Sequence, residues 1–220
     1  AVSPDGEDGF PGNLELTVRY TLTDENALVL DYTATTDAPT IINLTNHSYF
    51  NLEGQSSGSM LEQTLCLNAS TFTEGNAETC PTGRILPVAG TPMDFTRAKP
   101  IGRDIQAEYS QLQMCGGYDH NFILDKEPGM LALAAVARSE KTGITMETYT
   151  TQPGVQLYTS NSLQNDTRPG KTGGIYGRYQ GFCLETQHYP CTPSHPEFPS
   201  VELRPGEEYH ETTIYKFLTE

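Results

Sequence analysis

The stretch LELTVRYTL, residues 14–22, alternates apolar and polar side chains without a break. A repeat of two residues is typical of a β-strand with one buried face. After the turn sequence TDEN, residues 23–26, the alternation resumes over residues 28–34. The two runs predict an antiparallel hairpin, and this hairpin indicates the fold class.

Further strands are predicted along the rest of the chain. MLALAAVARS, residues 130–139, has helical propensity, but the turn EKTG and the run ITMETYTT that follow it favour a second hairpin. Shorter strands are expected at the following ranges: 63–67, 121–124, 154–158, 181–187 and 212–217. Glycine and proline separate these ranges, as turns between antiparallel strands require. The sequence therefore predicts an all-β protein.

Two segments, residues 71–103 and 187–200, are expected to be long loops. Loops of this length in a compact domain are usually binding elements or disordered. Their prolines and their aromatic residues Phe72, Phe95 and Phe198 favour ordered walls of a binding site. With 220 residues and no low-complexity linker, residues 1–220 are expected to form a single domain.

Charge and hydropathy narrow the classes of ligand. The formal net charge is −15 and the isoelectric point is near 4.6, which disfavours binding to nucleic acid and to anionic lipid. No apolar run reaches the roughly 18 residues that a membrane helix needs. We therefore expect no nucleic-acid partner, no membrane span, and a neutral small molecule as the ligand.

The five cysteines are dispersed and form no C-x-x-C pair, so a zinc or dithiol redox centre is not expected. An odd number of scattered cysteines favours free thiols in a reducing compartment. A cytoplasmic location is expected, and a periplasmic or extracellular one stays open.

Three polar stretches interrupt the predicted core. NLTNHSYFNL, residues 43–52, is expected to form a strand that carries His47 among amides, hydroxyls and aromatic rings. In GGYDHNF, residues 116–122, alternation directs Asp119 and His120 to opposite faces, so only one of them serves a given pocket. In GFCLETQHYP, residues 181–190, Glu185 stands in an apolar strand, where a carboxylate must be paired, hydrogen-bonded or used.

These stretches, together with QPGVQLYT (residues 152–159) and FPSVELRPGEEY (residues 198–209), closely resemble the galactose mutarotases, or aldose 1-epimerases. The similarity extends to SPDGEDGFPGNLELTVRY and GRILPVAGTPMDF, and so spans nearly the whole chain. It implies a large antiparallel β-sandwich with a sugar site on its broad face. It also implies an isomerase that interconverts the α and β anomers of free aldohexoses such as galactose and glucose.

The resemblance further implies roles for individual residues. By motif match, Glu185 is similar to the family's general base and His47 to its general acid. Asp119 resembles a ligand of sugar hydroxyls, and Gln156 a further polar residue of the pocket. The chemistry suits them, because a carboxylate is ionised and an imidazole can carry a proton near neutral pH. No metal and no organic cofactor is needed for proton transfer of this kind.

Two departures from the family are visible. Family members carry a segment ahead of SPDGEDGFPG that supplies an arginine and a further histidine, so this chain is expected to need a complementary N-terminal segment or chain. A β-sandwich without its first strands would expose unpaired edges. Cys80 and Cys191 also differ from the usual family residues, and a disulfide between them stays open.

Other readings of the same residues stay open as well. Asp119 and Glu185 could serve a glycoside hydrolase as a carboxylate pair. The scaffold could also belong to a non-catalytic sugar-binding or regulatory protein. On structural grounds alone, His47 and Glu185 could simply hold neighbouring backbone, and Asp119 could close a turn.

Overall fold

The computed structural model describes residues 1–163 and 168–219, which form an almost entirely β protein. In chain order the elements are β1 (Val2–Ser3), η1 (Glu7–Gly9), β2 (Leu14–Leu22), β3 (Ala27–Thr36), β4 (Thr40–Ile41), β5 (Thr64–Leu67), β6 (Thr71–Gly75), β7 (Pro81–Pro87), β8 (Lys99–Pro100), α1 (Ser110–Cys115), β9 (Asp119–Ile123), β10 (Ala132–Arg138), β11 (Ile144–Thr150), β12 (Gly154–Tyr158), β13 (Cys183–Gln187), η2 (Thr192–Ser194), β14 (Glu202–Leu203) and β15 (Tyr209–Thr219). The predicted all-β class is confirmed.

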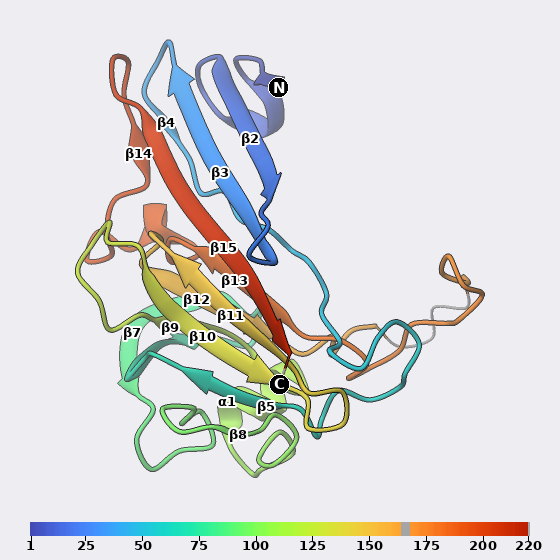
Figure 1. The fold of residues 1–220 in the computed structure, drawn as a ribbon. Coiled ribbons are helices and arrows are strands. Elements are labelled where there is room, and N and C mark those ends of the chain that lie inside the picture. The colour runs from blue at the N-terminus through green and yellow to red at the C-terminus, as the bar shows by residue number, and fades with distance from the viewer. Residues whose placement is uncertain (164–167, 220) are drawn as a thin grey trace.

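The larger sheet has eight strands in the order β1-β2-β3-β15-β11-β10-β5-β8. Its first hairpin is the predicted one, with Leu14 opposite Thr36 and Leu22 opposite Leu28. The second predicted hairpin is also present, as β10 paired with β11. In Figure 1 the long strands β3 and β15 run from the body of the molecule to the end where the N-terminus lies.

The smaller sheet has five strands in the order β13-β12-β9-β6-β7, so β13 and β7 are its edges. Strands β4 and β14 form a separate two-stranded sheet. Strand β12 covers the range that the sequence predicts, and β9, β13 and β15 lie within a few residues of theirs. None of the helices in the described ranges is long and apolar enough to cross a membrane.

The two large sheets pack face to face around one hydrophobic core. Buried side chains of the larger sheet (Leu30, Met146, Tyr215) and of the smaller sheet (Phe122, Leu157, Leu184) belong to the same cluster. The phenol of Tyr215 on β15 donates a hydrogen bond of 2.8 Å to the carbonyl of Leu184 on β13. This packing makes the protein an antiparallel β-sandwich, as expected, and leaves the outer face of the smaller sheet free to carry a site.

The predicted loop over residues 71–103 is wrong in its first half. Strands β6 and β7 pair there as a hairpin, and β8 follows. Because β7 is an edge strand, its two prolines need not donate to a further strand, which is why a proline-rich segment can extend the sheet. Phe72 and Phe95 are buried in the core and form no wall of a site.

Residues 188–200 are irregular apart from η2, in agreement with the loop predicted there. Phe198 is buried against Tyr189, with their ring centroids 5.2 Å apart. The aromatic residues of this loop therefore hold the loop in place.

Candidate active site

The outer face of the smaller sheet gathers polar side chains from three neighbouring strands. On β12, Gln156 lies directly opposite Glu185 of β13. Two residues further along, Tyr158 lies opposite Cys183 of β13 and Asp119 of β9. Since alternate residues of a strand share a face, all five side chains project from the same side of the sheet.

The residues that alternate with these on the same strands face the core. On β13, Leu184 and Thr186 are buried, and the hydroxyl of Thr186 lies 2.5 Å from that of Thr213 on β15. On β9, His120 is buried, and its ring packs edge-on against Phe72. Burial lowers the pKa of His120 to about 4, so this imidazole is neutral near pH 7. The prediction that Asp119 and His120 point to opposite faces of the strand is confirmed.

His47 reaches the site from the stretch at residues 43–52, which is not the strand that the sequence predicts. In this stretch, hydrogen bonds from side chains take the place of backbone pairing between strands. The side-chain amide of Asn43 exchanges two hydrogen bonds with the backbone of His188, of 2.9 and 3.0 Å. At the other end, Phe50 forms an isolated pair of backbone hydrogen bonds with Phe182. The segment therefore runs past the free edge of β13, fixed at both ends, with His47 between the two anchors.

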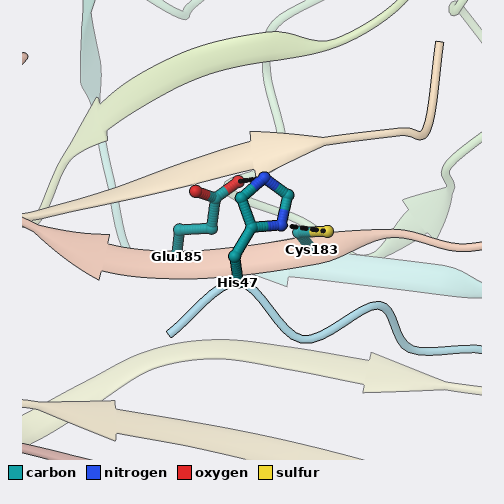
Figure 2. Close-up of side chains that lie close together, drawn as sticks. All are labelled: His47, Cys183 and Glu185. Atoms are coloured by element: carbon teal, nitrogen blue, oxygen red, sulfur yellow. Dashed lines mark hydrogen bonds and ion pairs between the residues drawn. The ribbon is translucent and has the colours of Figure 1, made fainter. Parts of the chain in front are cut away.

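The imidazole of His47 lies between two side chains of β13 (Figure 2). Its Nε2 atom is 3.5 Å from Oε1 of Glu185, and its Nδ1 atom is 3.5 Å from Sγ of Cys183. The His47 side chain is 50% exposed, whereas that of Glu185 is 10% exposed. One face of the imidazole stacks on Tyr49 at 5.1 Å between centroids, and Tyr158 meets the ring edge-on at 6.0 Å. These contacts orient the ring toward β13.

Asp119 and Gln156 are joined in a chain of hydrogen bonds across the floor of the site. The amide of Gln156 donates to Oδ1 of Asp119 at 2.8 Å. The amide of Gln187 in turn donates to Oε1 of Gln156 at 3.3 Å. The Gln156 amide is thereby oriented, and within residues 1–163 and 168–219 no hydrogen bond occupies the second oxygen of Asp119.

The four residues predicted from the sequence line one cavity of about 350 Å³. The other residues around it are Tyr49, Tyr158, Ser162, Gln187 and Pro190. Tyr49 and Tyr158 were missed as site residues, although each stands two positions from a predicted one. Tyr158 contacts Ser162 through a 2.6 Å hydrogen bond between their hydroxyls. A cavity of this size and polarity suits a small polar molecule.

Burial controls the electrostatics of the two carboxylates. Desolvation raises the pKa of Glu185 to about 7, with Asp119 adding to the rise and His47 opposing it. Desolvation also raises the pKa of Asp119, against the lowering effect of the Gln156 hydrogen bond and of His47. A carboxyl group whose pKa lies close to neutral can both accept and release a proton there, which a surface glutamate does poorly.

All five cysteines are free thiols, so the disulfide left open between Cys80 and Cys191 is not formed. The two residues are nevertheless neighbours: burial and then the adjacent Cys80 thiol raise the pKa of Cys191. Cys183 is the one buried cysteine of the five, and its thiol faces the site.

The fold and the cavity define the class of protein. A galactose 1-epimerase from Lactobacillus acidophilus superposes with a TM-score of 0.86 at 31% identity, covering all of this chain and 61% of that one. A homologue of aldose epimerases from C. elegans superposes with a TM-score of 0.84, also at 31% identity, covering all of this chain and 64% of that one. The chain is thus a β-sandwich of the galactose mutarotase type.

Sequence comparison identifies the family. A family model described as aldose 1-epimerase matches residues 1–216. Galactose mutarotase from Rattus norvegicus is 44% identical over 216 residues, which are 98% of this chain and 61% of the rat protein. Aldose 1-epimerase from Escherichia coli K12 is 39% identical over 220 residues, which are 99% of this chain and 62% of the bacterial protein. The chain belongs to the aldose 1-epimerase family and spans about three fifths of the length of these relatives.

Proposed function

We propose that this protein is an isomerase that interconverts the α and β anomers of free aldohexoses such as galactose and glucose. The observation that carries the proposal is the 3.5 Å approach of His47 Nε2 to Glu185 Oε1 inside a polar cavity. Membership of the aldose 1-epimerase family and the names of the relatives point to the same reaction.

The proposed reaction needs one base and one acid close together. To open a pyranose, a base removes the proton of the anomeric hydroxyl while an acid protonates the ring oxygen, and the bond between C1 and the ring oxygen breaks. Both oxygens are bonded to C1, so the two catalytic groups must converge on adjacent points. Glu185 serves as the general base and His47 as the general acid, and their spacing meets this requirement.

Ring closure reverses these steps. The open-chain aldehyde rotates about the C1–C2 bond and presents its other face to the C5 hydroxyl. His47, now neutral, takes the hydroxyl proton as the ring oxygen attacks C1, and Glu185 returns a proton to the new anomeric oxygen. The near-neutral pKa of Glu185 fits this exchange, because the carboxyl must act as base in one half of the cycle and as acid in the other.

Asp119 and Gln156 are proposed to hold the sugar. Asp119 accepts from a sugar hydroxyl with the oxygen that Gln156 does not occupy, and such a charge-assisted hydrogen bond in a buried site is strong. The amide of Gln156, oriented by Gln187, completes a polar floor next to Glu185. Tyr49 and Tyr158 offer apolar ring faces for the carbon side of the sugar.

The remaining parts of the proposal concern the protein beyond this cavity. Since the chain spans about three fifths of its relatives' length, we propose that it forms the C-terminal major part of one family domain. A complementary N-terminal segment or chain is proposed to complete the half-exposed His47 side of the site. The five free thiols support a cytoplasmic location.

Polarimetry of freshly dissolved α-galactose and α-glucose tests the function. Acceleration of mutarotation over the buffer rate, lost on replacement of Glu185 by Gln, is the expected result. Hexose binding without acceleration would instead identify a sugar-binding protein, and release of the aglycone from an aryl galactoside would identify a hydrolase. A chain that is monomeric and fully active by itself would contradict the need for a complementary segment.

A further inference from the structure

Three chemically different metal ligands meet at the edge of β13. The imidazole of His47, the thiol of Cys183 and the carboxylate of Glu185 each offer one donor atom, and these atoms all lie within 4.8 Å of one another. Figure 2 shows the imidazole between the other two side chains. In the described ranges, no other group of three such side chains comes as close together. Proton transfer to a sugar gives the Cys183 thiol no role, so its position in this cluster needs a separate explanation.

The spacing agrees with the coordination sphere of a small tetrahedral ion. Zinc binds sulfur at about 2.3 Å and nitrogen or oxygen at about 2.0–2.2 Å, so neighbouring donors in a tetrahedron lie about 3.3–3.6 Å apart. Nδ1 of His47 and Sγ of Cys183 are 3.5 Å apart. Nε2 of His47 and Oε1 of Glu185 are also 3.5 Å apart. A metal ion bound by two of the side chains therefore requires no movement of their backbone.

One imidazole binds one ion through one nitrogen, so the third donor atom, which lies up to 4.8 Å from another donor, must move closer by up to about 1.2–1.5 Å through side-chain rotation. The site allows this rotation, because His47 is half exposed and lies in a segment without regular structure. Glu185 and Cys183 are two positions apart on the same face of β13 and supply fixed points for the other two bonds. A water molecule from the open cavity would take the fourth position.

The donor set determines which ions fit. A thiolate with an imidazole and a carboxylate favours borderline and soft ions such as Zn²⁺, Co²⁺ and Cd²⁺, whereas Mg²⁺ and Ca²⁺ prefer oxygen donors only. Asp119 lines the same cavity and adds negative charge close to the cluster. No lysine or arginine among the described residues lines this cavity.

We propose that His47, Cys183 and Glu185 form a binding site for one thiophilic divalent metal ion, and that this ion excludes the sugar. On binding, the Cys183 thiol loses its proton to solvent and its sulfur bonds to the metal, with no change of oxidation state. The ion occupies the Glu185 carboxylate and one nitrogen of His47. If the proposed function holds, metal binding removes the base and the acid together and inhibits the reaction.

Cobalt titration tests the site without reference to activity. Co²⁺ added to the reduced, metal-free chain should give one equivalent of tetrahedral d–d absorption and a sulfur-to-cobalt charge-transfer band in the near ultraviolet. Replacement of Cys183 by Ser should abolish the charge-transfer band. Zn²⁺ should displace the cobalt, and millimolar Mg²⁺ or Ca²⁺ should leave the spectrum unchanged.

Two further variants make the result specific. The double variant Cys80→Ser, Cys191→Ser removes two thiols that are close to each other but do not belong to the cluster. It should leave the spectrum unchanged. Glu185→Gln keeps the sulfur and should retain the band while weakening cobalt binding by roughly tenfold or more. Near-ultraviolet circular dichroism would show whether the Cys183 variant is folded. If that variant misfolds, the Glu185→Gln variant still tests the site.

A band that survives the Cys183 replacement in a folded chain, or that disappears in the Cys80 and Cys191 double variant, would overturn the proposal. Absence of a band in the unmodified chain would do the same. The inhibitory part rests on the proposed function and is measured separately: Zn²⁺ should inhibit mutarotation, and galactose should compete with Co²⁺. Metal binding without competition would overturn the claim that the ion excludes the sugar. Mutarotation absent from a chain that binds cobalt would count against the proposed function and leave the metal site standing.

Discussion

His47 Nε2 lies 3.5 Å from Glu185 Oε1, and the two side chains reach this point from different kinds of backbone. Glu185 is fixed in β13, whose neighbouring side chains are buried in the core. His47 lies in an irregular segment held at its ends by Asn43 and by Phe50. One partner of the pair is thus rigid and the other can adjust, which suits two groups that must both contact oxygens of a sugar that enters and leaves.

Replacing Glu185 by Gln should lower kcat/KM for mutarotation by about 10²- to 10⁴-fold, because the amide keeps the shape of the side chain and cannot accept the anomeric proton. Polarimetry at neutral pH measures the loss. Glu211→Gln is the matched control, since Glu211 is another carboxyl whose pKa is raised by burial, but it bonds to Thr151 away from the cavity. Activity of the Glu185 variant within about tenfold of the unmodified protein would be inconsistent with a general base at this position.

The pH dependence of the rate should reflect the raised pKa of Glu185. Only the ionised carboxylate removes a proton, so kcat/KM should fall as the pH drops below about 7. An ordinary glutamate would remain active to well below this value. The rate is measured across the pH range after subtraction of the buffer-catalysed reaction. A plateau that continues down to about pH 5 would show that no carboxyl with a raised pKa limits the reaction.

The Glu185 carboxyl should lower the free energy of unfolding as pH rises, whereas a salt-bridged carboxylate raises it. The native state keeps the Glu185 proton up to about pH 7, whereas the unfolded chain loses it near the ordinary glutamate pKa of 4.5. Between these values the native state binds more protons, so this residue's contribution to the free energy of unfolding declines as pH rises. Glu185→Gln has no such titration. Its Tm relative to the unmodified protein should therefore increase between these two pH values, and parallel Tm curves in calorimetry would refute the linkage.

Asp119→Asn should raise KM for hexoses by roughly 10- to 100-fold, the value of a hydrogen bond to a charged group, with a smaller effect on kcat. The substitution removes the charge and keeps an oxygen for the amide of Gln156. Asp125→Asn offers a surface control, because Asp125 accepts from Ser70 outside the cavity. A variant that lost kcat while retaining its KM would indicate a role in chemistry instead of binding.

Much of the sheet structure follows from periodicity. The alternation in residues 14–22 predicts β2 and its hairpin partner. Only the first half of β2 packs against the core, through Leu14, Leu16 and Val18, whereas Tyr20 and Leu22 are exposed. The same rule separates Asp119 from His120 and groups Glu185 with Cys183. Alternation therefore determines which side chains share a face, although it says nothing of which strands are neighbours.

The two wrong predictions, at residues 43–52 and at β7, have identifiable causes. The stretch at residues 43–52 has strand-like composition, but its asparagines bond to backbone that is remote in sequence, and periodicity cannot predict such contacts. Strand β7 contains proline and glycine that usually end a strand, and it persists because it is an edge. The approach of His47 to Glu185 depends on these long-range contacts of residues 43–52. Residue patterns alone therefore indicated the candidates, and the family resemblance supplied their roles.

Tyr215→Phe should test how the core supports the site. The phenol of Tyr215 on the larger sheet donates to the carbonyl of Leu184, the residue next to Glu185 on the smaller sheet. Its loss leaves a buried carbonyl without that donor, so the free energy of unfolding should fall by about 1 kcal/mol in urea denaturation. Tyr149→Phe is the control, since its hydroxyl bonds to Glu147 in a less buried position and should cost less. Because the phenol contacts the backbone of β13 and not the cavity, mutarotation should be retained. A Tyr215 variant as stable as the unmodified protein would show that this bond between the sheets contributes nothing.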